Sequence, residues 1–594
     1  MRKSVSIALI LLIWIAFALR IHGITEQSLW RDEVDAIFFA LRPLAETAAM
    51  FKQAAQNGPL YFLSLRPWFR IVGSSEFALR FPSALAGTLS IPLIFQVARL
   101  LVDSPYRSKR SGLPQENEER DQHVGPSKFG QDSLGRDIIS RDIANRLAPL
   151  AATLFLAINP YQLWYGQEGK MYALIVTLAL LSSWFWLQGI NRGKSKYWVA
   201  YLVTTSISIY SHLLMVLIIP LHFLWFFIAW PQSRQQWKGY ALALSGLTLP
   251  YLPMIWWQWE MLVSTEKRTL FTFVPLQSML KKLLFSQSRG PEHVSLERLE
   301  DPIWLAPIFF LGLAGLLLGI SEIWATTKSG GVKQAIELSE SVKAEAGTGS
   351  KETSAAKNSM IGSSLNAAPH SLNHLNQWHR FGLIVSWLFF PICFIYLLSI
   401  RQPVFVDRYI IWIAPAAMMI LALGLKAVWR NAAKLSTPLT ASLIIYLFVF
   451  WGYVGWQQKT TTSKYDLRSA ILYVTERRQL DELLILQIPH TEYSYRYYSS
   501  DRGTHPFDGS TERLGNWKDG LYTNRNNELP EEQVVAEVNT QMKEIIGDAQ
   551  TVWVIYSETP MWDQKRFMER WLEENSDTVE SEDFYHAHVR KYKF

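Results

Sequence analysis

Leu29-Trp30-Arg31-Asp32-Glu33-Val34-Asp35 follows the first long apolar run of the chain, which extends from Val5 to Leu19. An apolar run that approaches 20 residues is typical of a helix that crosses a lipid bilayer. The charged segment therefore stands where a membrane span ends and a polar loop begins. Because several similar apolar runs follow, we expect a multi-spanning membrane protein whose first polar loop carries a cluster of carboxylates.

The composition agrees with a membrane protein. The chain has 594 residues, of which 49% are hydrophobic and only 18% charged, whereas a soluble protein carries about 25% charged residues. Its 25 tryptophans also favour this class, because tryptophan is enriched at membrane–water interfaces. The single cysteine, Cys393, excludes an intrachain disulfide and argues against a cysteine metal site. No basic helix or basic–aromatic module predicts a nucleic-acid partner.

We expect an α-helical polytopic domain over residues 1–456 with about eleven transmembrane helices. They are expected near residues 4–22, 77–102, 143–159, 171–189, 197–211, 213–230, 237–257, 303–325, 381–400, 410–425 and 438–456. The loop 24–74 contains two amphipathic segments, 37–51 and 60–72, which predict helices lying in the membrane interface. The polar, low-complexity segments 103–142 and 326–378 predict disordered inserts.

Residues 461–594 have the composition of a soluble domain. Residues 470–477 and 563–574 have helical patterns, whereas 483–487 and 552–556 are short apolar strands. This alternation predicts a small α/β domain.

The basic residues predict the orientation. Connections rich in lysine and arginine without acids, at 191–196 and 426–434, should be cytoplasmic together with the N-terminus and both inserts. Residues 24–74, 160–170, the surroundings of His212, 258–302, 401–409 and the C-terminal domain then all lie on the extracytoplasmic face of the cell (plasma or inner) membrane. Arg2, Lys3 and Ala16-Phe17-Ala18 also fit a cleaved signal peptide, and that alternative stays open.

Five motifs occur in the order and spacing of a known superfold. They are Asp32-Glu33, Gly58-Pro59-Leu60-Tyr61-Phe62, the segment Ser75 to Leu85, the segment Asn159 to Tyr172, and Asp407-Arg408-Tyr409. Over roughly residues 1–425 the chain resembles the membrane glycosyltransferases of the GT-C superfold. More closely, it resembles the bacterial branch, glycosyltransferase family 39, which is related to dolichyl-phosphate-mannose protein mannosyltransferases and to the transferases that add aminoarabinose or galacturonic acid to lipid A and lipopolysaccharide core.

The resemblance implies a hexosyl- or pentosyltransferase. It would move a sugar from a polyprenyl phosphate donor to an extracytoplasmic glycan, lipid or protein. Relatives often carry Asp-x-His-Pro-Pro-Leu-Tyr. Here the corresponding positions are Ala55, Asn57, Gly58 and Pro59, so the acid and the imidazole of that pattern are missing. No cofactor is firmly implied, and a requirement for a divalent metal stays open.

Sugar transfer from a phosphate needs a base for the acceptor hydroxyl and cations for the departing phosphate. Asp32 is the candidate base. The alternative is that Asp32 caps a helix N-terminus together with Asp35. Glu33, also assigned to the catalytic pair, would orient Asp32 or contact the acceptor, and its alternative is a solvated loop acid.

Six further residues are candidates for substrate binding. Lys170 and Arg408 would bind the donor phosphate, and Glu168 would bind a sugar hydroxyl or hold Lys170; Arg80, Tyr409 and His212 complete the set. The alternatives are an interface ion pair for Glu168 and Lys170, snorkelling for the arginines, and a structural role for His212.

Three other functional classes stay open. A transporter or flippase for a polyprenyl-linked glycan would place charges at mid-membrane depth, whereas the charges here cluster at span ends. A ligase that transfers a whole glycan is hardly separable by sequence. A non-catalytic scaffold would not need the Asp32-Glu33 loop.

Overall fold

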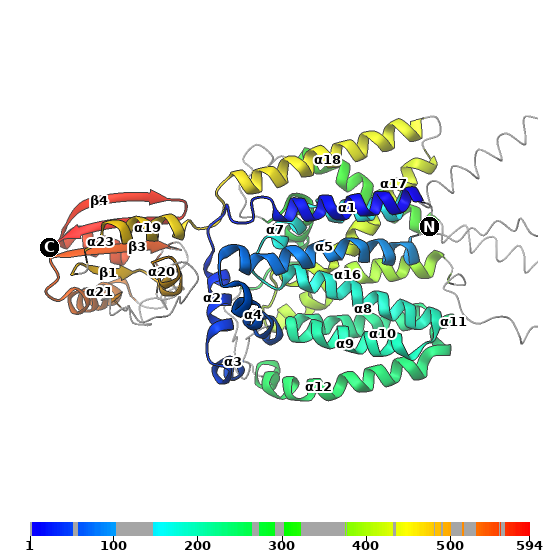
Figure 1. Cartoon of the computed structure of the whole chain (residues 1–594), viewed down its shortest axis with the longest axis horizontal. Helices are drawn as coiled ribbons and strands as arrows, with labels where there is room; N and C mark the ends of the chain where they lie inside the picture. The colour runs from blue at the N-terminus through cyan, green and yellow to red at the C-terminus, as the bar shows by residue number, and fades with distance from the viewer. Residues whose placement is uncertain are drawn as a thin grey trace, which may run out of the picture.

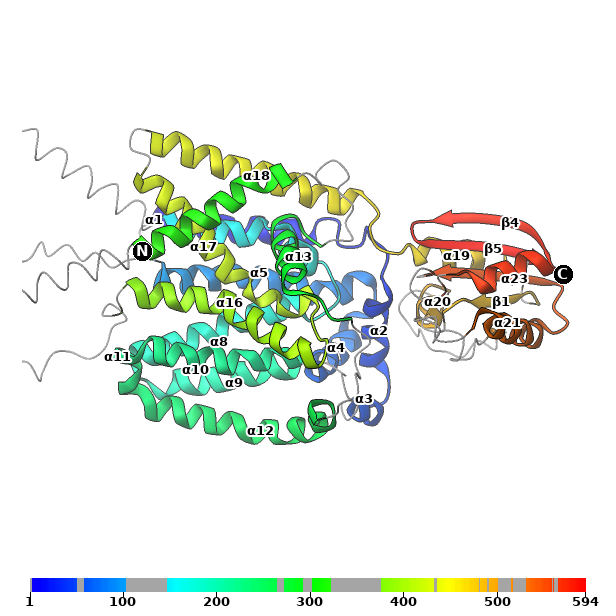
Figure 2. The same ribbon diagram turned by 180° about the vertical axis from the view of Figure 1, so that it is seen from behind.

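The computed structural model describes residues 3–50, 58–102, 147–263, 272–291, 302–321, 375, 377–431, 435–479, 481–488, 491–499, 514–515, 530–557, 559, 563 and 565–594. Long helices form a bundle, and a smaller sheet domain lies beyond one end of it (Figures 1 and 2). The predicted insert 103–142 lies outside the described residues, as does nearly all of 326–378.

Within the described residues, seven helices are long and apolar enough to cross a membrane. They are α1 (Lys3–Ile21), α5 (Glu76–Leu101), α8 (Tyr172–Arg192), the helix Ile303–Ser321, α16 (Gln377–Arg401), the segment Asp407–Asn431 and α18 (Ser436–Thr460). The other four expected spans coincide with the helix Leu147–Ile158, α9 (Ser195–Ser211), the pair η1 (Leu213–Leu217) and α10 (Ile218–Ile228), and α12 (Trp237–Val263). The predicted polytopic helical fold is therefore confirmed.

The bundle has an interior and a periphery. The segment Asp407–Asn431 comprises η6 (Asp407–Ile413) and α17 (Ala414–Asn431), and nearly all of it is buried by other helices. By contrast, most of the α1 surface is exposed. A helix that is apolar on all sides must be covered by protein or by lipid. We infer that α17 is covered by the bundle and that lipid covers most of α1.

Short helices cross the end of the bundle that faces the sheet domain. They are α2 (Arg31–Leu41), α3 (Leu44–Met50) and α4 (Pro59–Val72), and Figure 1 shows α2 and α3 running across the long helices. The predicted segments 37–51 and 60–72 correspond to them. Gly58 precedes α4 with φ +73°, and a Cβ there would lie 2.6 Å from the Ser211 carbonyl oxygen. Only glycine fits this close, left-handed turn.

Further short helices complete the bundle. At the same end as α2 lie α7 (Pro160–Gly166; Figure 1) and α13 (Leu276–Arg289; Figure 2). Asn159 begins α7 because its Oδ1 accepts a hydrogen bond from Gln162 N at 3.1 Å, which satisfies a free amide of the first turn. The start of α1 and α11 (Trp230–Ser233) lie at the opposite end (Figures 1 and 2), where η2 (Arg234–Gln236) follows α11. The short helix η4 (Pro302–Leu305) begins the described helix Ile303–Ser321.

The C-terminal domain is a five-stranded sheet with helices on both faces. Its elements are α19 (Leu467–Arg477), β1 (Leu483–Leu486), α20 (Thr491–Ser499), β2 (Leu514–Gly515), α21 (Glu531–Ile546), β3 (Thr551–Ser557), α23 (Phe567–Asn575), β4 (Asp577–Phe584) and β5 (Ala587–Lys593). The strand order is β2-β1-β3-β5-β4, with β1 parallel to β2 and β3 and with β5 antiparallel to β3 and β4. In register, Leu484 pairs with Trp553, and Val554 with Arg590.

Alternate residues of β1 and β3 pack against different helices on the two faces of the sheet. Ile485 and Val554 pack with α21 and α23 in one cluster of buried residues, whereas Leu484 and Trp553 belong to a cluster that includes α19 and α20. Successive strand residues point to opposite faces, so a strand buried on both faces reads as a continuous apolar run. The predicted strands 483–487 and 552–556 correspond to β1 and β3.

Candidate functional site

Charged residues from distant parts of the chain gather at the end of the bundle that faces the C-terminal domain. They come from the start of α2, the turn between α7 and α8, the beginning of η6, and the linker between α18 and α19. The long helices bring their ends together here, whereas the basic connection after α8 lies at the other end (Figure 1).

Glu33 lies at the centre of a buried ionic cluster. Its two carboxylate oxygens accept hydrogen bonds from Arg80 Nε and Nη2, both at 2.8 Å. Lys464 Nζ donates to Oε2 at 2.8 Å, and Gly169 N donates to Oε1 at 2.7 Å. Burial would raise the pKa of the Glu33 carboxyl, but the charges and hydrogen bonds of Arg80 and Lys464 lower it to about 2. The alternative of a solvated loop acid is therefore wrong, because the Glu33 side chain is fully buried.

Arg80 joins this cluster to the loop before α2. Its Nη1 donates to the carbonyls of Ile24 and Gln27, each at 2.8 Å, and its Nη2 donates to the carbonyl of Ser28 at 3.0 Å. Arg80 is 1% exposed, so it does not snorkel to the membrane surface. It ties α5 to the backbone of the first loop.

Asp32 and Arg408 form the accessible part of the site. Asp32 Oδ2 lies 3.9 Å from Arg408 Nη2, and both side chains are about one-quarter exposed. The Arg408 guanidinium lies 5.5 Å from the centre of the Trp30 ring, and its Nε donates to the Tyr172 hydroxyl at 3.0 Å. The alternative that Asp32 caps a helix N-terminus is wrong, because α2 begins at Arg31 and Trp30 is its N-cap residue.

Asp407, which the sequence analysis did not assign, holds η6 in place. Its Oδ2 accepts hydrogen bonds from the Tyr161 hydroxyl and the Ser286 hydroxyl, both at 3.0 Å. Asp407 is buried, so these donors compensate for the loss of water around the carboxylate. They connect α7 and α13 to the residue before Arg408, and thereby orient the arginine.

Glu168 and Lys170 occupy the turn before α8. Trp164 Nε1 donates to Glu168 Oε2 at 3.2 Å, while the other oxygen is buried without a hydrogen-bond partner among the described residues. Burial raises the pKa of Glu168 to about 7, and the Lys464 charge opposes that rise. Lys170 Nζ lies 5.6 Å from the centre of the Phe62 ring. Glu168 therefore bonds Trp164 in this structure.

Asp35 is a second carboxylate that the sequence analysis left without a role of its own. It follows Asp32 by three residues in α2, so the two lie on the same helix face. Burial raises the pKa of Asp35 to about 6, which nearby Lys170 counteracts and Asp32 reinforces. The i, i+3 spacing on a helix was the signal that could have identified it.

His212 and Tyr409 lie in an aromatic group beneath Arg408. The His212 ring centre is 5.1 Å from that of Tyr409 and 6.3 Å from that of Tyr172. Burial, reinforced by the charge of Arg408, lowers the pKa of His212 to about 3. His212 is therefore neutral near pH 7, which favours a packing role over binding a phosphate by charge.

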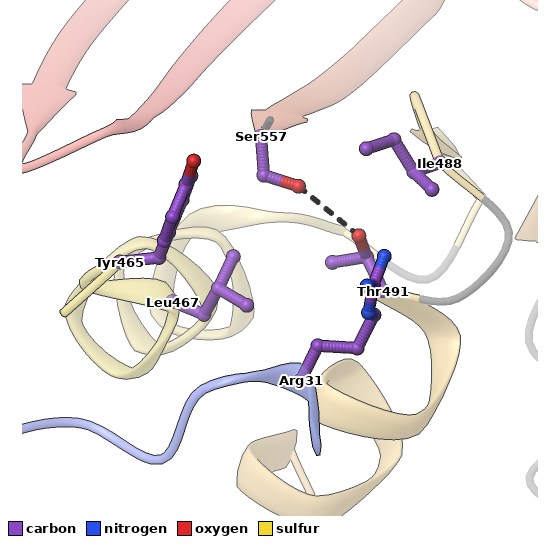
Figure 3. Close-up of a pocket in the computed structure, with 6 residues that line it drawn as sticks. All are labelled: Arg31, Tyr465, Leu467, Ile488, Thr491 and Ser557. Atoms are coloured by element: carbon purple, nitrogen blue, oxygen red, sulfur yellow. Dashed lines mark hydrogen bonds between the residues drawn. The ribbon is translucent and has the colours of Figure 1, made fainter. Parts of the chain in front are cut away.

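A small pocket lies at the seam between α2 and the C-terminal domain (Figure 3). Its lining comprises Arg31, Tyr465, Leu467, Ile488, Thr491 and Ser557. The Thr491 and Ser557 hydroxyls lie 3.1 Å apart, and the Arg31 side chain extends towards Thr491. The pocket has room for about one water molecule. It shows that the residue before Asp32 reaches the C-terminal domain.

Solved structures resemble the whole chain. ArnT from Cupriavidus metallidurans in the apo state aligns over 98% of this chain and 97% of its own, with 10% sequence identity and a TM-score of 0.52. The oligosaccharyltransferase from Archaeoglobus fulgidus in the apo form aligns over 96% of this chain and 71% of its own, with 11% identity and a TM-score of 0.51. This chain has the GT-C fold.

The GT-C likeness is structural. Another structure of the same ArnT, bound to undecaprenyl phosphate, aligns over 98% of this chain and 97% of its own, with 10% identity and a TM-score of 0.47. No family model matches the sequence, and no curated protein matches it either.

The GT-C fold brings most of the predicted residues to one end of the bundle. Asp32 and Arg408 face each other, and Glu33 and Arg80 form a buried pair behind them. Within the described residues, no group of three or more His, Cys, Asp or Glu side chains is arranged to hold a metal ion. Lys464, which sequence reasoning missed, enters the site from the linker.

Proposed function

We propose that this chain is a glycosyltransferase of the cell membrane that moves a sugar from a polyprenyl-phosphate-linked donor to an extracytoplasmic acceptor. The observation that supports it most is the partly exposed Asp32 carboxylate, which lies 3.9 Å from the Arg408 guanidinium at one end of a GT-C bundle. A base and a cation side by side match the two ends of a displacement at a sugar phosphate.

In the proposed reaction Asp32 accepts the proton of the acceptor hydroxyl. The acceptor oxygen forms a bond to the anomeric carbon, and the bond from that carbon to the phosphate oxygen breaks. The electron pair leaves with the polyprenyl phosphate. Arg408 and Lys170 stabilise the charge on the departing phosphate, and a carboxylate near the sugar stabilises the positive charge that develops on its ring.

The other residues take supporting roles in this proposal. Glu33 positions the first turn of α2, because its carboxylate is fully occupied by Arg80, Lys464 and Gly169 N. Glu168, one oxygen of which has no hydrogen-bond partner among the residues that the structure describes, binds a hydroxyl of the donor sugar. The choice of carrier rests on the sequence resemblance, and undecaprenyl phosphate is a suitable probe of that class.

The size of the transferred group is a second question. The Archaeoglobus fulgidus neighbour is an oligosaccharyltransferase, so its likeness also favours transfer of a whole glycan. Both reactions need the same base and the same phosphate contacts. They differ in the donor that is consumed, which the experiment below distinguishes.

The test uses purified full-length protein in vesicles of known orientation. A panel of undecaprenyl phosphate donors, each carrying a different radiolabelled sugar or glycan, is incubated with membrane acceptors. We expect one donor to be consumed when it faces the side of the C-terminal domain, and Asp32→Asn to lower the rate at least about 10³-fold. Asp583→Asn, which changes an exposed acid in β4, serves as the control.

Two results would contradict the proposal. Near-normal transfer by Asp32→Asn would show that Asp32 is not the base. Movement of intact carrier across the membrane without transfer, in wild type and variant alike, would instead support a flippase.

A further inference from the structure

The linker before the C-terminal domain is fastened to the loop that precedes α2. Gln27 Nε2 donates to the Thr461 carbonyl at 2.9 Å, and Gln27 Oε1 accepts from Ser463 N at 3.2 Å. Farther along, Arg468 N donates to Ser28 Oγ at 3.2 Å. These bonds join two segments more than 430 residues apart in sequence. The linker therefore lies directly beside the start of the helix that carries Asp32.

Lys464 extends from this linker into the buried cluster. Its Nζ lies 2.8 Å from Glu33 Oε2, and the two side chains are 7% and 0% exposed. The same ammonium lies 5.3 Å from the centre of the Trp164 ring, whose Nε1 donates to Glu168. One cation from the linker thus reaches Glu33 and the neighbourhood of Glu168.

Neutralising Glu33 does not by itself require Lys464. Arg80 already donates to both oxygens of the Glu33 carboxylate, and this bidentate pair is electrically balanced. Burying a second cation costs free energy unless its new contacts compensate for the lost hydration. Lys464 is therefore a costly addition to a pair that is already satisfied. The burial of Lys464 is explained if its contact with Glu33 contributes to the geometry of the site.

The C-terminal domain also holds α2 from a second direction. The Leu29 amide donates to the Tyr498 hydroxyl of α20 at 2.9 Å. The Tyr493 and Phe38 rings lie 4.1 Å apart between centroids. The linker and the C-terminal domain therefore contact the segment before α2, the third residue of α2 and its last half.

We propose that Lys464 is a positioning residue for the transfer reaction, and that the linker and C-terminal domain form part of the catalytic unit. Lys464 holds Glu33, Glu33 holds the first turn of α2, and that turn keeps Asp32 opposite Arg408. This inference rests on the proposed function for its catalytic consequence. Its structural part, the restraint of α2, stands independently of that function.

The first measurement is amide hydrogen exchange of peptides covering residues 29–41 in the full-length protein in detergent. We expect Lys464→Met to accelerate exchange there about tenfold or more, since a hydrogen bond to a charged group is removed. Lys464→Arg, which keeps the charge, should recover part of the protection. Lys459→Met is the matched control, because Lys459 Nζ donates to the carbonyls of Leu19 and His22, at 2.7 and 2.8 Å, rather than to the Glu33 cluster.

The second measurement is the rate of transfer with the donor that the wild type uses. Because Lys464 touches no substrate in this proposal, Lys464→Met should lower kcat about tenfold and change KM for the donor less than about threefold. Lys464→Arg should restore part of kcat, and Lys459→Met should behave as wild type. If Lys464→Met is not recovered from membranes, Lys464→Gln replaces it with the same expectations.

The two measurements separate the two proposals. Unchanged exchange and unchanged kcat in Lys464→Met, with Asp32→Asn inactive, would overturn the positioning role and leave the transferase intact. Absence of transfer by wild type with every donor would overturn the proposed function, and the exchange experiment would still test the restraint of α2. A raised KM with unchanged kcat would also overturn the positioning role, since it would indicate direct donor binding by Lys464.

Discussion

Replacing Glu33 by glutamine perturbs the cluster that joins α2, α5 and the linker. The fully buried carboxylate accepts hydrogen bonds at 2.8 Å from both Arg80 and Lys464. Glutamine has nearly the same shape but carries no charge. Two buried cations would then lose the carboxylate that they share, and breaking a buried ion pair in this way costs about 3–5 kcal/mol.

The lowered pKa of Glu33 leads to a similar estimate of its contribution to the free energy of unfolding. The Arg80 and Lys464 charges outweigh burial and lower the pKa of Glu33 from 4.5 to about 2, a difference that corresponds to roughly 3 kcal/mol of stability. Because the pKa in the folded state is depressed, this contribution is fully present above pH 4.5. It is lost as the pH falls through about 2, where the wild-type carboxyl is also neutral.

The assay is thermal unfolding of the purified protein in detergent between pH 7 and pH 3. We expect Glu33→Gln to lower Tm by at least a few degrees at pH 7, and the gap to wild type to narrow as the pH falls below about 4.5. Glu531→Gln is the matched control, since Glu531 pairs with Lys565 at 2.9 Å and Arg570 at 3.5 Å but is 49% exposed. An exposed pair contributes little.

Two results would refute this reasoning. One is a Glu33→Gln protein that melts within a degree of Glu531→Gln at pH 7. The other is a gap to wild type that stays constant down to pH 3, because the lost stability would then not come from the charge of Glu33.

Four other changes have defined outcomes. Burial raises the pKa of Glu168 to about 7, so we expect wild-type kcat/KM to rise through pH 7 as the carboxylate ionises, and Glu168→Gln to show a profile without that rise. Arg408→Lys keeps the charge but loses the planar donor set, so initial rates should show a donor KM about tenfold higher. Lys170→Met should raise the donor KM and leave the acceptor KM unchanged; an equal effect on both would argue against a phosphate contact. Gly58→Ala should lower Tm, because φ is +73° and the added Cβ would meet the Ser211 carbonyl, at a cost of about 1–2 kcal/mol or more.

The sequence by itself determined the helical membrane fold and singled out several of the charged residues that meet at one end of the bundle. A bilayer requires about 20 apolar residues per span, so the spans leave a strong local pattern, and each expected span coincides with a helix. Polar residues at the span ends, such as Asp32, Lys170 and Arg408, were recognisable for the same reason. The strands β1 and β3 were also predictable because they are continuous apolar runs, whereas exposed β4 has the sequence Asp577–Phe584 with few apolar residues.

Only the tertiary structure decided which charged side chains are buried in ion pairs and which are exposed. Glu33 lies next to Asp32 in sequence, yet one carboxylate is fully buried and the other partly exposed. The difference arises from Arg80 and Lys464, which are 47 and 431 residues away from Glu33 in the chain. No local pattern encodes such contacts, because a charged residue at a helix end has the same sequence signature whether it faces water or a distant partner. The meeting of the linker with the first loop is a property of the folded chain alone.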